Sequence, residues 1–278
     1  MILSNVRVEP LERRRKYYDK ITIKISSLWW FMVKKKALKK LINLNFIDYT
    51  NQTYLVGKYD LPYVRCPDIV NPDYLALYSE VINYKKTDNT CVCFYQYDNK
   101  FDGINGLFNA IYYNDEKLLS KYKERFKGVK YAIAPDYSQC GDIPRIENLY
   151  RLFKSRLVSN WLLLECDILV IPNVTYANEN YFDVMLDGME NVEVVAFSVK
   201  GSTREIKEKE LLYKAINHTV ESLNKLKKII VYSVSTNDEK VMSLFEYALL
   251  KGIEVVIPNN ILKERNIIHK VVNSNGQN

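Results

Sequence analysis

From residue 91 onward, short runs of apolar residues alternate with longer stretches in which apolar residues recur every three or four positions. The runs predict strands at 91–97, 129–134, 167–172, 192–198, 228–234 and 253–257. The stretches between them predict helices at about 104–126, 143–165, 179–188, 205–226 and 237–251. Such alternation is typical of parallel strands connected by crossover helices. We therefore predict an α/β fold, with an open doubly wound sheet favoured over a βα barrel.

Local signals delimit the last of these helices at both ends. Thr236 and Glu239 have the spacing of a capping box, in which each side chain satisfies a backbone N–H at the start of a helix. Gly252 follows the apolar stripe and suits the left-handed conformation that commonly ends a helix. The two signals agree with the helix predicted at 237–251.

The first part of the chain has a different organisation. A short alternating pattern predicts a strand at 21–25, and an amphipathic pattern predicts a helix at about 27–44. Asparagine, glycine and proline residues predict turns and short extended pieces over 45–75. We accordingly divide the chain into a basic α+β amino-terminal extension at 1–60, an α/β domain at 61–258 and a tail at 259–278.

The net positive charge of the chain lies in this extension. Residues 1–60 hold 13 lysines and arginines against 5 acidic residues, whereas the rest of the chain holds 27 against 28. Aromatic residues beside cations are typical of a nucleic-acid surface, because the rings stack on bases while the cations contact phosphates. The candidate nucleic-acid contacts are Arg13, Arg14, Arg15, Lys34, Lys35 and Lys36. A basic helix on an anionic membrane and a solvated charged face are the alternatives.

The composition indicates a globular protein of the cytoplasm. Hydrophobic residues make up 47% and charged residues 26% of the chain, which are ordinary values for a globular protein. The apolar runs are too short to predict a transmembrane segment, and no secretory signal pattern is seen. The five cysteines lack CxxC spacing, so we expect reduced thiols.

Polar residues follow several of the predicted strands. In both architectures considered, ligands bind beyond the carboxyl ends of the strands. The loop after the second strand is the richest, and the helix that follows it adds two arginines and an amide. The candidate catalytic residues are Asp136, Asp142 and Arg151. The candidate ligand-binding residues are Ser138, Arg145, Asn148, Asn173 and Ser198.

Each candidate also has a purely structural interpretation. Asp142 precedes Pro144 and can cap the following helix. Asp136 and Asn173 can shape turns, and Arg151 can be a surface charge.

Several familiar chemistries are disfavoured. The chain has no GxxxxGK[ST] phosphate loop, and the pair Gly103 and Gly106 lacks the third glycine of a dinucleotide fingerprint. His218 and His269 are the only histidines, which argues against a serine–histidine nucleophile and against a histidine-rich metal site. We identify no metal ligands and no cofactor. Any catalysis would use carboxylates, arginines, hydroxyls or a carboxylate-bound cation such as magnesium.

Six ordered motifs resemble a known family. They are Pro135-Asp136-Tyr137-Ser138, Asn148-Leu149-Tyr150-Arg151, Val170-Ile171-Pro172-Asn173-Val174, Phe182-Asp183-Val184-Met185-Leu186-Asp187-Gly188, Val195-Ala196-Phe197-Ser198 and Lys228-Ile229-Ile230-Val231-Tyr232. In order and spacing they resemble the phage and mobile-element family catalogued as domain of unknown function 4417, over roughly residues 75–258. The resemblance implies a phage, prokaryotic or plasmid-like setting and implies no activity.

Three functions follow as hypotheses. The first is a mobile-element or phage accessory protein that binds a nucleotide, a nucleotide-derived signal or nucleic acid at the strand ends through Arg145, Asn148 and Arg151. The second is a hydrolase of a phosphate ester or N-glycosidic bond, with Asp136 as general base or metal ligand and Arg151 stabilising developing charge. The third is an interaction protein that blocks a host factor. The sequence leaves the oligomeric state open.

Overall fold

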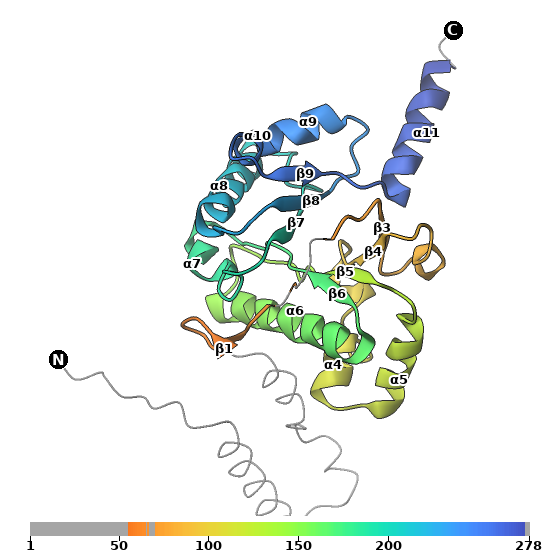
Figure 1. Ribbon diagram of the computed structural model, residues 1–278, viewed down its shortest axis with the longest axis vertical. Helices are drawn as coiled ribbons and strands as arrows, with labels where there is room; N and C mark the ends of the chain where they lie inside the picture. Colours follow the sequence, from red (N-terminus) through yellow and green to blue (C-terminus); the bar gives the residue numbers. More distant parts are fainter. Residues whose placement is uncertain (1–54, 65, 67–69, 276–278) are drawn as a thin grey trace, which may run out of the picture. The chain divides into compact units, whose positions relative to one another are not determined.

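A computed structural model describes residues 55–64, 66 and 70–275 (Figure 1). The strand predicted at 21–25, the helix predicted at 27–44 and the basic candidates of the amino-terminal extension lie outside the described residues.

Parallel strands form two sheets. β3 (Tyr74–Leu77), β4 (Thr90–Cys93), β5 (Tyr131–Ile133) and β6 (Leu169–Ile171) lie side by side in chain order, and β7 (Val194–Ser198), β8 (Lys228–Tyr232) and β9 (Glu254–Val256) form the second sheet. β1 (Leu55–Val56) and β2 (Leu61–Pro62) form a short antiparallel pair. All six predicted strands are present, in shorter form. β3 was not predicted, because its four residues are too short a run to show a period beside turn-forming residues.

Single bridges connect the two sheets at both edges. Asn173 bridges Ala196, and Val174 donates its backbone N–H to the Ala196 oxygen at 2.9 Å. Tyr74 bridges Asn259 in the same parallel sense. Within the described residues these contacts do not make a closed barrel of continuous ladders. The predicted parallel α/β fold is confirmed, although its strands are divided between two sheets.

Each sheet packs on the other through one face. Leu75, Cys91 and Ile171 of the first sheet share a buried core with Val195 and Ile230 of the second. The alternate positions of β3–β6 pack instead against α4 (Leu107–Tyr112), α5 (Glu116–Arg125) and α6 (Arg145–Cys166). Both faces of these strands are therefore covered, which explains their near-continuous apolar sequences.

The remaining helices cover the second sheet or follow it (Figure 1). They are α7 (Phe182–Met185), α8 (Ile206–Ser222), α9 (Asp238–Met242), α10 (Glu246–Leu250) and α11 (Ile261–Asn275). The single helix predicted at 104–126 is broken into α4 and α5, because Asn114 adopts a φ of 49° and Asp115 caps α5. Residues assigned to the tail form α11.

Two predicted caps are wrong. Asn237, and not Thr236, caps α9: its side chain accepts a hydrogen bond from the Lys240 N–H at 2.9 Å, so the helix begins one residue later than the capping box implied. Asp142 does not cap α6, because the helix begins at Arg145, directly after Pro144. Asp142 is exposed. Gly252 does follow α10 with a left-handed φ of 78°, as expected.

Gly188 and Gly252 provide a matched pair of substitutions. Both have a left-handed φ, of 76° and 78°, so alanine introduces similar backbone strain at each. A Cβ on Gly188 would lie 2.5 Å from Cγ2 of Val56, whereas no described atom lies within 4 Å of a Cβ on Gly252. We expect Gly188→Ala to lower the free energy of unfolding by about 1–3 kcal/mol more than Gly252→Ala, measured by urea denaturation. Equal losses would show that the β1–β2 segment does not pack closely on Gly188.

Candidate functional site

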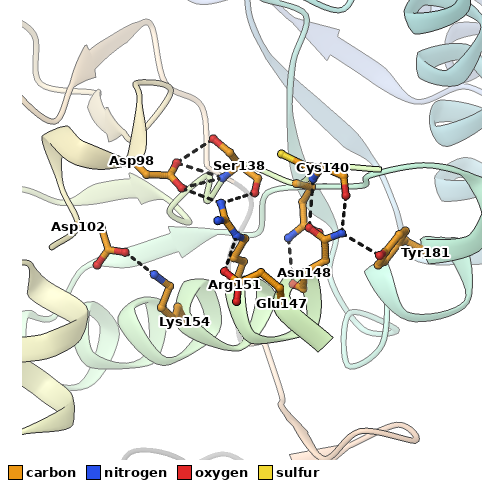
Figure 2. Close-up of polar contacts among 10 residues, drawn as sticks. Asp98, Asp102, Ser138, Cys140, Glu147, Asn148, Arg151, Lys154 and Tyr181 are labelled. Carbon is orange, nitrogen blue, oxygen red and sulfur yellow. Dashed lines mark hydrogen bonds and ion pairs between the residues drawn. The ribbon is translucent and has the colours of Figure 1, made fainter. Parts of the chain in front are cut away.

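Four polar side chains on α6 recur at every third position. Arg145, Asn148, Arg151 and Lys154 form this α6 polar row. Residues three apart are neighbours on a helix surface, and each member of the row contacts a loop or short helix that follows β4, β5 or β6. Figure 2 shows its last three members reaching toward those loops.

Arg151 joins the loops that follow β4 and β5. Its guanidinium donates to a carboxylate oxygen of Asp98 at 3.1 Å, to the backbone oxygen of Ser138 at 2.8 Å and to Glu147 at 3.1 Å (Figure 2). Asp98 also accepts hydrogen bonds from Ser138, at 3.1 Å from its backbone N–H and at 2.9 Å from its hydroxyl. The charge of Arg151 is therefore balanced by carboxylates of the protein itself.

Asn148 fixes the next part of the β5 loop. It is buried, and its amide donates to the Cys140 oxygen at 2.7 Å and to the Tyr181 hydroxyl at 2.8 Å. Its carbonyl accepts the Cys140 N–H at 3.1 Å (Figure 2). Both amide hydrogens and the carbonyl are thus used within the protein.

The two ends of the row are also paired. Arg145 donates to the Asn180 oxygen at 2.7 Å and to Asp183 at 2.7 Å. Lys154 forms an ion pair with Asp102 (Figure 2), and its ammonium lies 4.2 Å from the centroid of the Tyr137 ring. A ligand that used Arg145, Asn148 or Arg151, as the sequence predicts, would have to replace contacts that hold the loops in place.

A second group of polar residues lies at the carboxyl ends of β4, β5 and β6. Asn173 donates from its amide nitrogen to Oδ1 of Asp136 at 2.9 Å. The Tyr95 hydroxyl donates to Oδ1 of Asn173 at 2.7 Å. These three residues, the strand-end cluster, meet because the carboxyl ends of adjacent parallel strands lie at one edge of a sheet. Ser155 of α6 anchors the same edge by donating to the Pro135 oxygen at 2.6 Å.

Asp136 carries the carboxyl group of the strand-end cluster, and its pKa is raised. Its surroundings are dense, yet the residue keeps partial solvent exposure. Burial and, to a smaller extent, the negative charge of Asp98 raise the pKa of Asp136 to about 7, against the opposing effect of the Asn173 hydrogen bond. Near neutral pH both protonation states are therefore populated, which suits a group that accepts and releases protons.

The other predicted residues are placed differently. Ser198 ends β7, opposite Tyr232 of β8 in the second sheet, and its hydroxyl accepts the Lys200 N–H at 3.3 Å. Asp142 is exposed, in the loop before α6. The structure thus brings Asp136 together with Asn173, and Ser138 together with Arg151.

Tyr95 is the residue that sequence reasoning missed. It is buried, and its ring stacks on Tyr232 with 4.7 Å between the ring centroids. Cys91, Cys93 and Tyr95 alternate along the chain and belong to the same core, so the period of the first predicted strand pointed to this face. A tyrosine at the end of such a row carries a hydroxyl that needs a polar partner.

The described residues contain no group of three or more histidine, cysteine, aspartate or glutamate side chains arranged to hold a metal ion. None of the helices in the described part of the chain has the length and apolar character that crossing a membrane requires.

Comparison with known proteins gives one family and one relative. The family described as domain of unknown function (DUF4417) matches residues 53–248, a range that contains the α6 polar row and the strand-end cluster. The "Gene 1 protein" of Mycobacterium phage L5 is 28% identical over 145 residues, which are 51% of this chain. The match spans 58% of the length of that relative.

We predict that Asn148 stabilises the fold and that its substitution lowers the free energy of unfolding substantially. Asn148→Ala leaves the partly buried Cys140 backbone groups and the buried Tyr181 hydroxyl without their partner, so we expect the free energy of unfolding to fall by about 2–4 kcal/mol. Asn109→Ala is the control, because Asn109 makes one exposed hydrogen bond, to Gly103, and should cost less than about 1 kcal/mol. Similar losses in guanidinium denaturation would contradict the assignment.

Asp136 is predicted to make stability fall as the pH rises. Its pKa is about 7 in the folded protein against an ordinary value of 3.8, so the folded state binds more protons between these values and the free energy of unfolding decreases over that range. Asp136→Asn removes this dependence. The variant should match the wild type near pH 4 and exceed it by on the order of 1–3 kcal/mol at pH 8. A difference that stays constant over this range in denaturation experiments would contradict the raised pKa.

Proposed function

Since the chain belongs to the phage-associated family described as domain of unknown function (DUF4417), which names no reaction, we propose a function from the site: the protein binds a nucleoside or nucleotide at the strand-end cluster and hydrolyses its N-glycosidic bond. In this proposal Asp136 is the proton-transfer group. Asn173 orients it.

The observation that carries this proposal is the state of Asp136. The residue is partly exposed at the carboxyl edge of the sheet, is held by one amide and has a pKa near neutrality. Such a carboxylate can take a proton from water while the water oxygen bonds to the anomeric carbon. The C–N bond breaks with its electron pair on the departing base, which then receives the proton that Asp136 took from the water.

The charges around Asp136 favour an N-glycosidic bond over a phosphate ester. Arg145 and Arg151, which would have received an anion, are paired with Asp183 and Asp98. The ionised carboxylate of Asp136 repels a phosphate but stabilises the positive charge that develops on a sugar ring during glycosidic cleavage. Any phosphate of the ligand would therefore lie away from Asp136.

The test is release of a free base. Purified protein would be incubated with nucleosides, nucleotides and NAD-type dinucleotides, with and without magnesium, and the products separated by chromatography. We expect the wild type to release base and Asp136→Asn to lose at least about 100-fold in rate while keeping its circular dichroism spectrum. Asp88→Asn is the control, because Asp88 is exposed and precedes β4, at the amino end of the strand. It should retain full activity.

Two outcomes would contradict the proposal. Equal rates in the wild type and in Asp136→Asn would exclude Asp136 as the proton-transfer group. If no compound releases base and none raises the melting temperature of the protein, the hypothesis of an interaction protein that blocks a host factor is favoured.

A further inference from the structure

The side-chain amide of Asn173 can face Asp136 in two ways. Its nitrogen is a donor and its oxygen is an acceptor, and the two ends have nearly the same shape. An N–H group facing the carboxylate stabilises the ionised form, whereas an oxygen facing it would repel that form. The residue that selects between these orientations therefore controls the proton on Asp136.

Tyr95 contacts the other end of this amide. Its hydroxyl lies 2.7 Å from Oδ1 of Asn173, and Nδ2 of Asn173 lies 2.9 Å from Oδ1 of Asp136. The three groups form one chain of donors, from the phenol to the amide to the carboxylate. Since β5 lies between β4 and β6, Tyr95 and Asn173 approach from the strands on either side of the one that leads to Asp136.

The second sheet holds Tyr95 in place. The Tyr95 ring is buried and stacks on Tyr232 of β8, with 4.7 Å between centroids and 25° between ring planes. The Tyr232 hydroxyl is itself buried and has no hydrogen-bond partner among the described residues. Tyr232 therefore contributes its ring to this arrangement, and Tyr95 contributes a ring and a hydroxyl.

We propose that Tyr95 is a positioning residue of the candidate site: its hydroxyl fixes the Asn173 amide so that the N–H group faces Asp136. The catalytic consequence of this role rests on the proposed function, whereas the orientation of the amide does not. Removing the hydroxyl leaves Oδ1 of Asn173 without its donor, and the amide is then free to turn.

Few groups near Asp136 compete with it in titration. Among the described residues, the ionisable neighbours are Cys93 at the end of β4, Tyr95 and Asp98 after β4, and Tyr176 after β6. Burial raises the pKa of Cys93, Tyr95 and Tyr176, so these three stay neutral around pH 7. Asp98 is paired with Arg151. The titration of Cys93, Tyr95 and Tyr176 therefore does not overlap with that of Asp136.

The two stacked tyrosines allow a matched experiment in the full chain. The backbone amide of Tyr137, next to Asp136, would be followed by ¹⁵N NMR between pH 4 and 9. In Tyr95→Phe the Asn173 hydrogen bond to the ionised carboxylate weakens, so we expect the midpoint to rise by about 0.5–1 pH unit. Tyr232→Phe keeps the ring and removes a hydroxyl that has no hydrogen-bond partner in the described part of the chain, so its midpoint should match the wild type.

Asn173→Ala is a second variant for the same titration and can be measured if Tyr95→Phe does not fold. It should raise the midpoint at least as much as Tyr95→Phe, and adding Tyr95→Phe to it should cause no further shift, because the hydroxyl acts through the amide. An unchanged midpoint in Tyr95→Phe, an equal rise in Tyr232→Phe, or an additive double variant would overturn the proposal.

Activity separates this inference from the proposed function. If base release is found, the acidic limb of kcat/KM against pH should move upward in Tyr95→Phe by the same amount as the NMR midpoint. A shifted midpoint in a protein that releases no base would leave Tyr95 as the residue that positions Asn173 and would remove the hydrolase proposal alone.

Discussion

The α6 polar row is the constraint on which the candidate site depends. Loops at the carboxyl ends of parallel strands have no ladder to hold them, and α6 supplies their partners every third residue. Arg151 joins Asp98 to Ser138, and Asn148 fixes Cys140, so the segment that follows Asp136 is held at a defined place. Hydrogen bonds to charged groups contribute about 1.5–3 kcal/mol each when buried, and less at partly exposed sites such as Arg151.

The same contacts decide which chemistry is left for a ligand. The arginines of the row are used to hold loops, whereas Asp136 remains partly exposed and accepts a hydrogen bond from the Asn173 amide. Placing a carboxyl group in dense surroundings costs stability above neutral pH, and proteins tolerate such costs most often at functional sites. The strand-end cluster therefore contains a carboxyl group whose ionisation lowers the stability of the fold. The nearby arginines of α6 are paired with other carboxylates.

The sequence predicts the strands and the residues at the carboxyl edge of the first sheet. It does not predict the side-chain contacts between them. Periodicity locates six strands, and parallel topology places Asp136 and Asn173 at one edge, because both inferences depend on local pattern and on a general rule of α/β folds. The division into two sheets, the break at Asn114 and the pairing of Arg151 with Asp98 depend on residues far apart in the chain or on single backbone angles. Tyr95 was missed because a buried aromatic residue at a strand end is indistinguishable in sequence from a core residue.

The central claim is that Asp136 changes its protonation state near neutral pH. A ¹³C NMR titration of the aspartate carboxyl carbons in the wild-type protein, with Asp136→Asn to assign the signal, measures this directly. We predict a midpoint near pH 7, because burial and the charge of Asp98 outweigh the Asn173 hydrogen bond. A midpoint near pH 4, typical of a solvated aspartate, would contradict it.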